Sequence, residues 1–494
     1  MLTPRNPDAL AREHFDVIIV GGGIYGSMLA LEAVQHGLRP LLIERHDFGA
    51  ATSFNSLRIV HGGLRYLQDF DFRQFRDTVA ERRWFLRTFP NLVRPLPCLA
   101  PLYGYGLHSP PVYRLALHLN DALSADRNTD LPVSHAIPAG RVADAAEVRK
   151  IFPEAEQAAL RGGAVWHDAL ISDTPRLIID VLRWACAGGA AVLNYTTADR
   201  LILTGDQVTG IEAIDQVSGQ KLRFHAATVI NAAGPWNREL ASRFGRLDET
   251  LYTPSLAWNV VFRRPALSDH ALAVRSKRRG SHMYFLVPWK GMLFAGTGHE
   301  VWNGGPDDGR PSSRQLEHFI ADLNDAVPSL RLGLDDVARI MAGLLPAVRQ
   351  GSRKLLRRAA VIDHAAHGGP VGLISICGVK FTLARRVAET VIAHAFPSAK
   401  GQGIVGNGPP AAKSIHPSYA FSWMPSTADN DWKAPLRQAI ETEAVHHLDD
   451  LLLRRSALGD NPERARMLAP QVCDLFEWNE ARSAREIETL MRAI

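Results

Sequence analysis

A histidine, an arginine and a tyrosine lie within six residues of one another, at His61, Arg65 and Tyr66. They offer a candidate base, a fixed cation and an orienting hydroxyl, groups that can take a proton from an alcohol and hold a developing anion. Small hydroxyl residues precede them in 52–56. The cluster could be an ordinary polar loop. Its density of hydrogen-bonding groups, so soon after the elements described next, indicates instead a loop that runs past a bound nucleotide towards a reactive ring.

The elements before this cluster form a nucleotide-binding unit. The apolar run 15–20 predicts a buried strand that ends at Gly21. Residues 27–37 predict a helix that stops at a glycine, and 40–43 predict a second strand that closes on Glu44. Strand, glycine turn, helix, strand and terminal acid together form the dinucleotide-binding βαβ fingerprint.

The three glycines of the fingerprint and its terminal acid each have a physical role. Gly21 allows the tight turn, Gly23 lets the pyrophosphate approach the backbone, and Gly26 lets helix and strand pack closely. The helix N-terminus offers N–H groups to the phosphates, and Glu44 accepts hydrogen bonds from the ribose hydroxyls. The motif lies near the N-terminus and no second copy follows for a separate nicotinamide, so the sequence favours FAD over NAD.

Composition narrows the class of protein. A chain of 494 residues predicts two or three domains with a large core. Four scattered cysteines and nineteen histidines without zinc-type spacing predict a reducing compartment, no disulfide framework and no metal site. Neither a signal peptide nor a membrane-spanning run is apparent, so we expect a cytoplasmic protein.

One basic patch has two readings. It could rest on an anionic lipid surface, which would make the protein peripheral on the inner face of the membrane, or it could be ordinary solvated surface. Nucleic acid is not expected, because no aromatic platform accompanies the patch. The patch consists of Arg263, Arg264, Arg275, Lys277, Arg278 and Arg279.

The remaining elements predict an α/β fold, α+β overall. Helices are expected over 70–90, 172–190, 312–327 and 382–396, and short strands over 191–195, 200–204, 208–214, 228–231 and 373–378. The stretch 252–300 alternates as antiparallel strands do, which predicts a second sheet that covers the cofactor and carries the substrate pocket.

The C-terminal part differs in composition. Residues 397–434 are rich in Gly, Pro, Ser and Asn and are expected to form a linker. Apolar residues from Leu436 to Leu452 recur at helical spacing, which predicts one amphipathic helix that opens a small helical domain over 435–494 and serves packing alone. His446 and His447 are expected on the surface of that helix.

The Thr52-Ser53 pair and the run from Val60 to Leu67, Val-His-Gly-Gly-Leu-Arg-Tyr-Leu, closely resemble the FAD-dependent, quinone-linked glycerol-3-phosphate dehydrogenases, within the amino-acid-oxidase-like fold. The family's glycine motif and ribose acid match as well. Further similar segments are 231–236, 287–289, 296–297, 378–382 and 443–455.

The resemblance implies a layout and a set of site residues. The FAD-dependent oxidoreductase region would cover 1–396, with FAD-binding segments at about 15–80, 160–240 and 340–396 and substrate segments at about 81–159 and 250–340. Catalytic residues would be His61, Arg65, Tyr66 and Lys380. The FAD-binding set would be Gly21, Gly23, Ile24, Tyr25, Gly26, Glu44, Arg45, Thr52, Ser53, Ser56, His61, Gly62, Gly63, Ala233, Gly234, Gly343, Gly378, Lys380, Phe381 and Thr382.

The substrate half of the pattern departs from the family. The family's Gly-x-Arg-Pro turn corresponds to Gly343-Leu344-Leu345-Pro346, so Leu345 replaces the substrate arginine. The family's Lys-Gly-Ser-His segment corresponds to Leu256-Ala257-Trp258-Asn259. Together, Leu345 and Trp258 would favour an apolar or ring-shaped part of a ligand.

The resemblance implies an alcohol substrate and a quinone or other electron acceptor, with a second copy of the chain as a further candidate partner. An FAD oxidase of another hydroxy acid, polyol or amine and a non-catalytic FAD-binding protein remain the alternatives.

Overall fold

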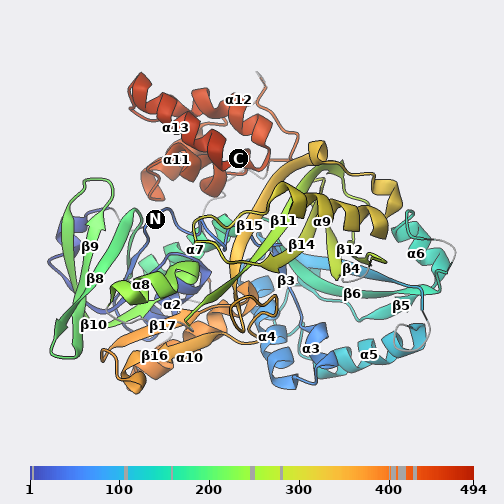
Figure 1. Cartoon of the computed structure of the whole chain (residues 1–494), viewed down its shortest axis with the longest axis horizontal. Helices are drawn as coiled ribbons and strands as arrows, with labels where there is room; N and C mark the ends of the chain where they lie inside the picture. Colours follow the sequence, from blue (N-terminus) through green and yellow to red (C-terminus); the bar gives the residue numbers. More distant parts are fainter. Residues whose placement is uncertain are drawn as a thin grey trace.

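The computed structural model describes residues 1–2, 5–104, 109–156, 159–244, 251–278, 282–399, 401, 408–409, 419–426 and 431–494. Two large sheets form its centre, which confirms the expected α/β fold class (Figure 1). Most of the expected linker 397–434 lies outside the described residues. In the part of the chain that the structure describes, no helix is both long enough and apolar enough to cross a membrane.

The first sheet holds the nucleotide-binding unit. Its central strands pair in parallel in the order β17-β10-β1-β2-β7, and β16, β9 and β8 extend it with antiparallel pairs. The strands are β1 (His14–Val20), β2 (Pro40–Ile43), β7 (Ala191–Leu193), β8 (Thr196–Thr204), β9 (Gln207–Asp215), β10 (Lys221–Asn231), β16 (Ala360–Asp363) and β17 (Leu373–Cys377).

Three helices cover one face of the parallel strands. Helix α2 (Ile24–Gln35) packs between α7 (Thr174–Ala187) and α10 (Ala384–Ala395). Small residues on α2, including Ala30 and Ala33, are completely buried in the shared core. This close packing fixes the N-terminus of α2 at the carboxyl ends of β1 and β10, where open parallel sheets bind nucleotides.

The second sheet is mostly antiparallel and runs in the order β15-β11-β14-β13-β12-β4-β6-β3, with β5 beside β6. Its strands are β3 (Ile59–Val60), β4 (Val93–Leu102), β5 (Arg141–Ala143), β6 (Gly162–Ile171), β11 (Thr253–Pro265), β12 (Ala271–Arg275), β13 (Met283–Trp289), β14 (Met292–Val301) and β15 (Val337–Ala347). Strands β3, β6 and most of β15 belong to this sheet, although their residues lie in segments that were expected to form the FAD-binding domain.

Of the remaining helices, α1 and α8 contact strands of the first sheet, and the others surround the second sheet and the junction between the two sheets. Asp71 caps α4, and Ser312 and Gln315 form a capping box on α9, which is why both helices begin where the sequence predicts. These helices are α1 (Pro7–Leu10), α3 (Leu64–Gln68), α4 (Phe72–Thr88), α5 (Pro110–Leu123), α6 (Ala145–Ile151), α8 (Asn237–Arg243) and α9 (Ser313–Ala326).

The C-terminal helices α11 (Ala434–Thr442), α12 (Pro462–Cys473) and α13 (Glu480–Ala493) pack together on one side of the molecule (Figure 1). The prediction of one helix from Leu436 to Leu452 is wrong. Helix α11 ends at Thr442, Ala444 adopts a positive φ of 53°, and a separate π-helical turn follows at Asp450–Arg455.

The two adjacent histidines after α11 are not on a helix surface, contrary to the prediction. The rings of His446 and His447 are half-buried and lie 5.6 and 4.7 Å from the ring of Tyr195. They belong to the contact between the C-terminal helices and the first sheet.

The basic patch, for which a lipid contact and an ordinary solvated surface were both considered, is mostly ion-paired. Arg264 pairs with Asp336 at 3.0 Å, Lys277 with Glu156 at 2.8 Å, and Arg278 with Asp322 at 3.4 Å. Arg263 lies 3.4 Å from Glu463, and Arg279 is outside the described residues. These pairings favour the alternative reading, an ordinary solvated surface.

Candidate FAD and substrate site

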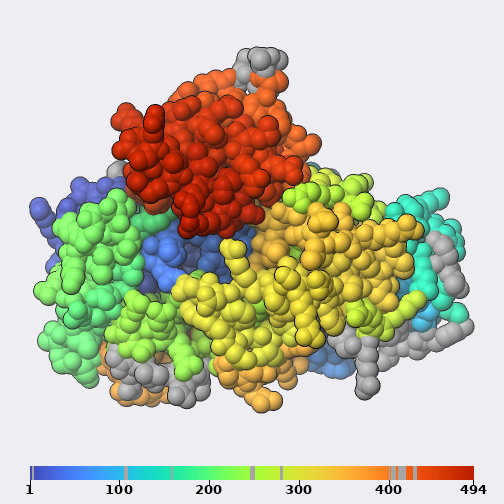
Figure 2. Space-filling model, turned by 45° about the horizontal axis from the view of Figure 1, so that its top comes forward, coloured from blue at the N-terminus to red at the C-terminus, as the bar shows by residue number. Residues whose placement is uncertain are grey.

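One cavity of about 1550 Å³ extends along the N-terminus of α2 and between the two sheets. Pockets for a single small ligand are usually roughly 300–1,000 Å³, so this cavity can hold a large cofactor and a substrate together. In Figure 2 the cavity opens as a hollow with blue N-terminal surface at its base. The red C-terminal helices border it, together with a green and a yellow part of the surface.

The glycine turn forms the floor of this cavity. A Cβ atom on Gly26 would lie 1.8 Å from the carbonyl oxygen of Gly21, and one on Gly21 would lie 2.6 Å from that of Ala232. These two glycines therefore serve close backbone packing. At Gly23 an added Cβ would meet only the Ser53 hydroxyl, at 3.1 Å, so Gly23 presents open backbone to the cavity.

The cavity walls fit the phosphates and ribose of FAD. The N-terminus of α2 lies at the cavity, where its N–H groups and its dipole favour an anion. The carboxylate of Glu44 lines the cavity beside the turn and accepts a hydrogen bond from the Gly22 N–H at 2.6 Å. The buried hydroxyl of Ser56 also lines it and has no hydrogen-bond partner among the described residues, as expected for a group that meets a ligand.

His61 is held in place from behind. The N–H of the next residue, Gly62, donates to Asp168 at 2.5 Å, and Asp168 is buried with Arg82 at 3.4 Å. A Cβ on Gly62 would lie 2.1 Å from Nη1 of Arg82, so a larger residue there would displace the guanidinium that pairs with Asp168. This support fixes the half-buried His61 ring against the cavity.

Lys380 is positioned by the nucleotide motif itself. The Tyr25 hydroxyl, at the start of α2, accepts hydrogen bonds from the N–H groups of Val379 and Lys380, both at 3.1 Å, and donates to the Lys380 carbonyl at 2.8 Å. Gly378 is required beside it, because a Cβ there would lie 2.1 Å from the Tyr25 ring.

The Lys380 ammonium meets Tyr66 at the cavity. Its Nζ donates to the Tyr66 hydroxyl and lies 4.2 Å from the centre of that ring, while Gln74 donates to the same hydroxyl at 3.1 Å. Burial and the charge of Arg65 lower the pKa of Lys380 to about 8. Burial raises the pKa of Tyr66 to about 12. At neutral pH the pair is therefore a cation and a neutral hydroxyl.

His61 completes the group. Its ring centre lies 6.0 Å from that of Tyr66. Burial, followed by the charge of Lys380, lowers the pKa of His61 to about 4. The imidazole is thus neutral at physiological pH, and it makes no hydrogen bond within the described part of the chain. A neutral, unbonded imidazole in a cavity is suited to accept a proton.

Almost all the residues predicted for the site line this one cavity. From the FAD-binding set, only Gly26, Gly62 and Gly63 do not line it. The first two serve the packing just described, and Gly63 begins α3 with a left-handed φ of 81°. The predicted residues that line it are Gly21, Gly23, Ile24, Tyr25, Glu44, Arg45, Thr52, Ser53, Ser56, His61, Arg65, Tyr66, Ala233, Gly234, Gly343, Gly378, Lys380, Phe381 and Thr382.

The two segments that depart from the family pattern behave differently. Leu345 lines the cavity. Trp258 does not, contrary to the interpretation that it favours a ring-shaped ligand. Its side chain is 3% exposed and packs against Phe319 in the core of the second sheet. On the opposite face of the strand, Ala257 and Asn259 line the cavity instead.

Several cavity residues carried no signal in the sequence. His299 hydrogen-bonds to the Ser255 hydroxyl at 2.7 Å, and burial lowers its pKa to about 4. Asp307 closes part of the rim by pairing with Arg45 at 2.7 Å and by accepting from the Trp236 indole at 3.0 Å. Others are His46, Thr196 and Thr197, whereas Thr297, His447, Asp449 and Arg454 fall in the segments 296–297 and 443–455 that resemble the family.

Comparison with known proteins decides the family. Residues 16–393 match the model of the family described as FAD dependent oxidoreductase. The chain belongs to the FAD-dependent oxidoreductase family. It is therefore a flavoenzyme with FAD as its cofactor, as predicted.

The relatives and the solved structure compared next are all glycerol-3-phosphate dehydrogenases. The chain is 32% identical over 405 residues to a glycerol-3-phosphate dehydrogenase of Synechocystis sp., covering 78% of this chain and 71% of the relative. It is 28% identical over 538 residues to glycerol-3-phosphate dehydrogenase 2 of Mycobacterium tuberculosis, covering 98% and 89%. The structure of the FAD-complexed Bacillus halodurans glycerol-3-phosphate dehydrogenase has a TM-score of 0.70 at 19% identity, covering 99% and 96%, and shows the shared fold.

Proposed function

We propose that this flavoenzyme oxidises a secondary alcohol related to glycerol 3-phosphate and passes the electrons to a quinone. The observation that carries the proposal is the meeting of His61, Tyr66 and Lys380 in the cavity that begins at the Gly23 turn. A base, a hydroxyl and a cation beside a flavin site are the groups that alcohol oxidation requires.

Each side chain has one task. His61 takes the hydroxyl proton, because its low pKa keeps it unprotonated. Lys380 stabilises the negative charge that develops on the alcohol oxygen, and Tyr66 orients the ammonium through their hydrogen bond. When bound, FAD supplies the hydride acceptor for the carbinol carbon.

The pH dependence follows from the two lowered pKa values. Protonation of His61 should reduce flavin reduction only below about pH 4, and loss of the Lys380 proton should reduce it above about pH 8. We therefore expect a constant single-turnover rate from about pH 5 to about pH 7, where an ordinary histidine would lose activity on acidification. Stopped-flow reduction across that range tests this, and a tenfold fall between neutral pH and pH 5 would contradict it.

Leu345 limits which alcohol is accepted. An arginine contact to a phosphate is a charge-assisted bond of about 1.5–3 kcal/mol, so its absence weakens phosphate binding by roughly tenfold or more. Glycerol 3-phosphate is therefore expected to be a poor substrate, and the preferred alcohol is bulkier or less charged. Leu345→Arg should improve flavin reduction by glycerol 3-phosphate by roughly tenfold or more. Leu334→Arg, at a 43% exposed leucine away from the cavity, is the matched control. Efficient wild-type turnover at micromolar glycerol 3-phosphate would refute the restriction.

Anaerobic mixing with a panel of alcohols tests the proposal as a whole. The panel contains glycerol 3-phosphate, polyols, hydroxy acids, sugar alcohols and amines. Loss of the yellow flavin absorbance with a secondary alcohol supports the proposal, and bleaching by amines alone contradicts it. Quinone or oxygen is then admitted to the reduced enzyme. Rapid recovery of colour with quinone and slow recovery with oxygen is expected, and the reverse would identify an oxidase.

A further inference from the structure

The loop that carries the ribose acid connects the glycine turn to the C-terminal helices. On one side, Glu44 accepts from the Gly22 N–H at 2.6 Å and the Gly49 N–H donates to the Gly22 carbonyl at 2.9 Å. Between these two anchors lies Asp47, which is 1% exposed. Asp47 therefore belongs to the same anchored loop as Glu44.

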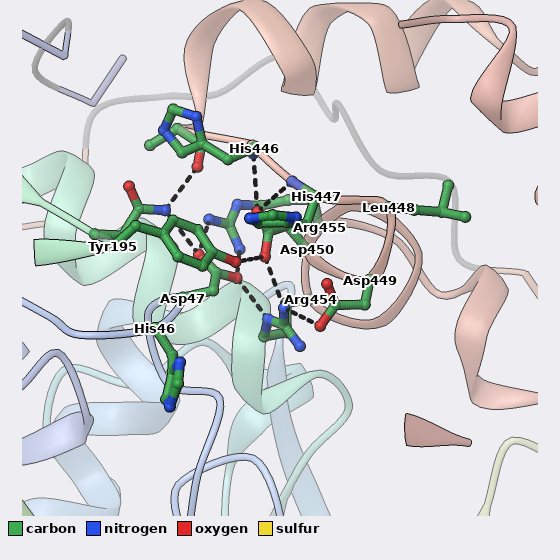
Figure 3. Close-up of polar contacts among 12 residues, drawn as sticks. His46, Asp47, Tyr195, His446, His447, Leu448, Asp449, Asp450, Arg454 and Arg455 are labelled. Atoms are coloured by element: carbon green, nitrogen blue, oxygen red, sulfur yellow. Dashed lines mark hydrogen bonds and ion pairs between the residues drawn. The ribbon is translucent and has the colours of Figure 1, made fainter. Parts of the chain in front are cut away.

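Asp47 is held by two arginines of the C-terminal part. It accepts from Arg454 at 2.5 Å and from Arg455 at 2.7 and 2.8 Å (Figure 3). Burial alone would raise the pKa of Asp47, but the charges of Arg455 and Arg454 lower it below its usual value. Arg454 also reaches Asp450 at 2.7 Å, and Asp450 accepts from the Tyr195 hydroxyl at 2.5 Å.

The same C-terminal residues form one wall of the cavity. His447, Asp449 and Arg454 line it together with Glu44, His46 and Thr196 of the first sheet. Asp449 is well suited to meet a ligand there. Its side chain is 21% exposed, and Arg454 pairs with its Oδ2 at 2.7 Å. Its Oδ1 accepts no hydrogen bond from any residue that the structure describes.

We propose that the C-terminal helical domain is part of the FAD site, and that Asp449 accepts a hydrogen bond from the adenosine half of the cofactor. The adenosine half is indicated because the acid at the end of the second strand marks the ribose position in this fold. The ribose hydroxyls and the adenine amine are donors that a carboxylate oxygen can accept. The role of the domain is thus more than packing.

The proposal has a thermodynamic consequence. If the docked domain contacts FAD, then FAD binding must favour docking by the same free energy with which docking favours FAD binding. Bound FAD should therefore slow hydrogen exchange of backbone amides in 446–455, which are far along the chain from the glycine motif. Riboflavin, which lacks the adenosine half, should leave that segment unchanged.

Ligand affinities of the full-length apoprotein test the contact without using any substrate, so failure here is distinct from failure of the proposed activity. Asp449→Ala should weaken the binding of both FAD and ADP by roughly tenfold. Asp449→Asn should also weaken both, because its single amide oxygen cannot accept from Arg454 and from the cofactor together. Asp474→Ala, at an exposed carboxylate of the same domain outside the cavity, is the matched control.

The outcomes separate clearly. Weaker FAD and ADP binding in Asp449→Ala but not in Asp474→Ala, with riboflavin binding unchanged and FAD-dependent protection of 446–455, is the expected result. Unchanged or tighter FAD binding in Asp449→Ala would overturn the proposal. Equal losses for riboflavin and ADP would also overturn it, because they would mean a general loss of structure. The absence of FAD-dependent protection in 446–455 would contradict the coupling.

Discussion

Gly23→Val protein is expected to fold and remain soluble but to be purified without FAD. An added Cβ at Gly23 meets only the end of the Ser53 side chain, at 3.1 Å, so the protein itself has room for a side chain. The same atoms would occupy the space in which a pyrophosphate approaches the backbone at the helix N-terminus. The measurement is the ratio of flavin to protein absorbance, together with the thermal midpoint of the apoprotein.

Two other glycines provide controls for this variant. Gly333 has no atom within 4 Å of an added Cβ, so Gly333→Val should be soluble and yellow. Gly26→Val should fail to fold, because its Cβ would lie 1.8 Å from a backbone oxygen. Full FAD occupancy in soluble Gly23→Val would contradict the placement of the pyrophosphate at this turn.

Lys380→Met is expected to retain FAD and to reduce it at least roughly 10²-fold more slowly than wild type. Methionine preserves the length of the side chain and removes the cation that faces the developing negative charge. The decrease in rate above about pH 8 should disappear in this variant, because that decrease reports the Lys380 proton. A loss of rate without a change in the pH profile would indicate a merely structural effect.

Single-turnover stopped-flow measurement separates binding from chemistry in this experiment. His61→Ala should show a similar decrease in reduction rate, since it removes the proposed proton acceptor. Lys150→Met, on the exposed surface of α6, should behave as wild type. Wild-type reduction rates in both Lys380→Met and His61→Ala would move the chemistry to other residues.

Local sequence patterns predicted the nucleotide-binding unit well. The run 15–20 is β-branched and apolar because β1 is buried in the middle of a parallel sheet, and such strands differ clearly from their surroundings. That β6 and β15 each join the second sheet was not predicted. Which sheet a strand joins is decided by contacts distant in the sequence, which local periodicity does not report.

The errors in the C-terminal part have a related cause. The apolar spacing from Leu436 to Leu452 continues through a turn in which Ala444 has a positive φ. At this turn Glu443 is buried and accepts two hydrogen bonds from Arg176 at 2.8 Å. A tertiary ion pair thus overrides helical periodicity, and neither residue marks its distant partner in the sequence.

The candidate site divides in the same way. His61 and Lys380 themselves lie in short motifs, so a family resemblance could indicate them, whereas Asp168 and Arg82 behind His61 lie in none. His299 reaches the cavity from another part of the chain and follows no motif, and Asp449 lies in the family-like segment 443–455, which was expected to serve packing alone. Alternation along β11 places Trp258 on the face opposite Ala257 and Asn259, which is why it lies in the core and not at the cavity.

Deuterium at the carbinol carbon provides the most direct test of the central claim, that the enzyme removes a hydride from a secondary alcohol. The alcohol that bleaches the flavin is prepared with deuterium at that carbon alone, and anaerobic single-turnover reduction is compared with the unlabelled compound. We expect a severalfold slower reduction with the labelled alcohol and one deuterium lost per flavin reduced. Equal rates with retention of the label in the product would contradict it.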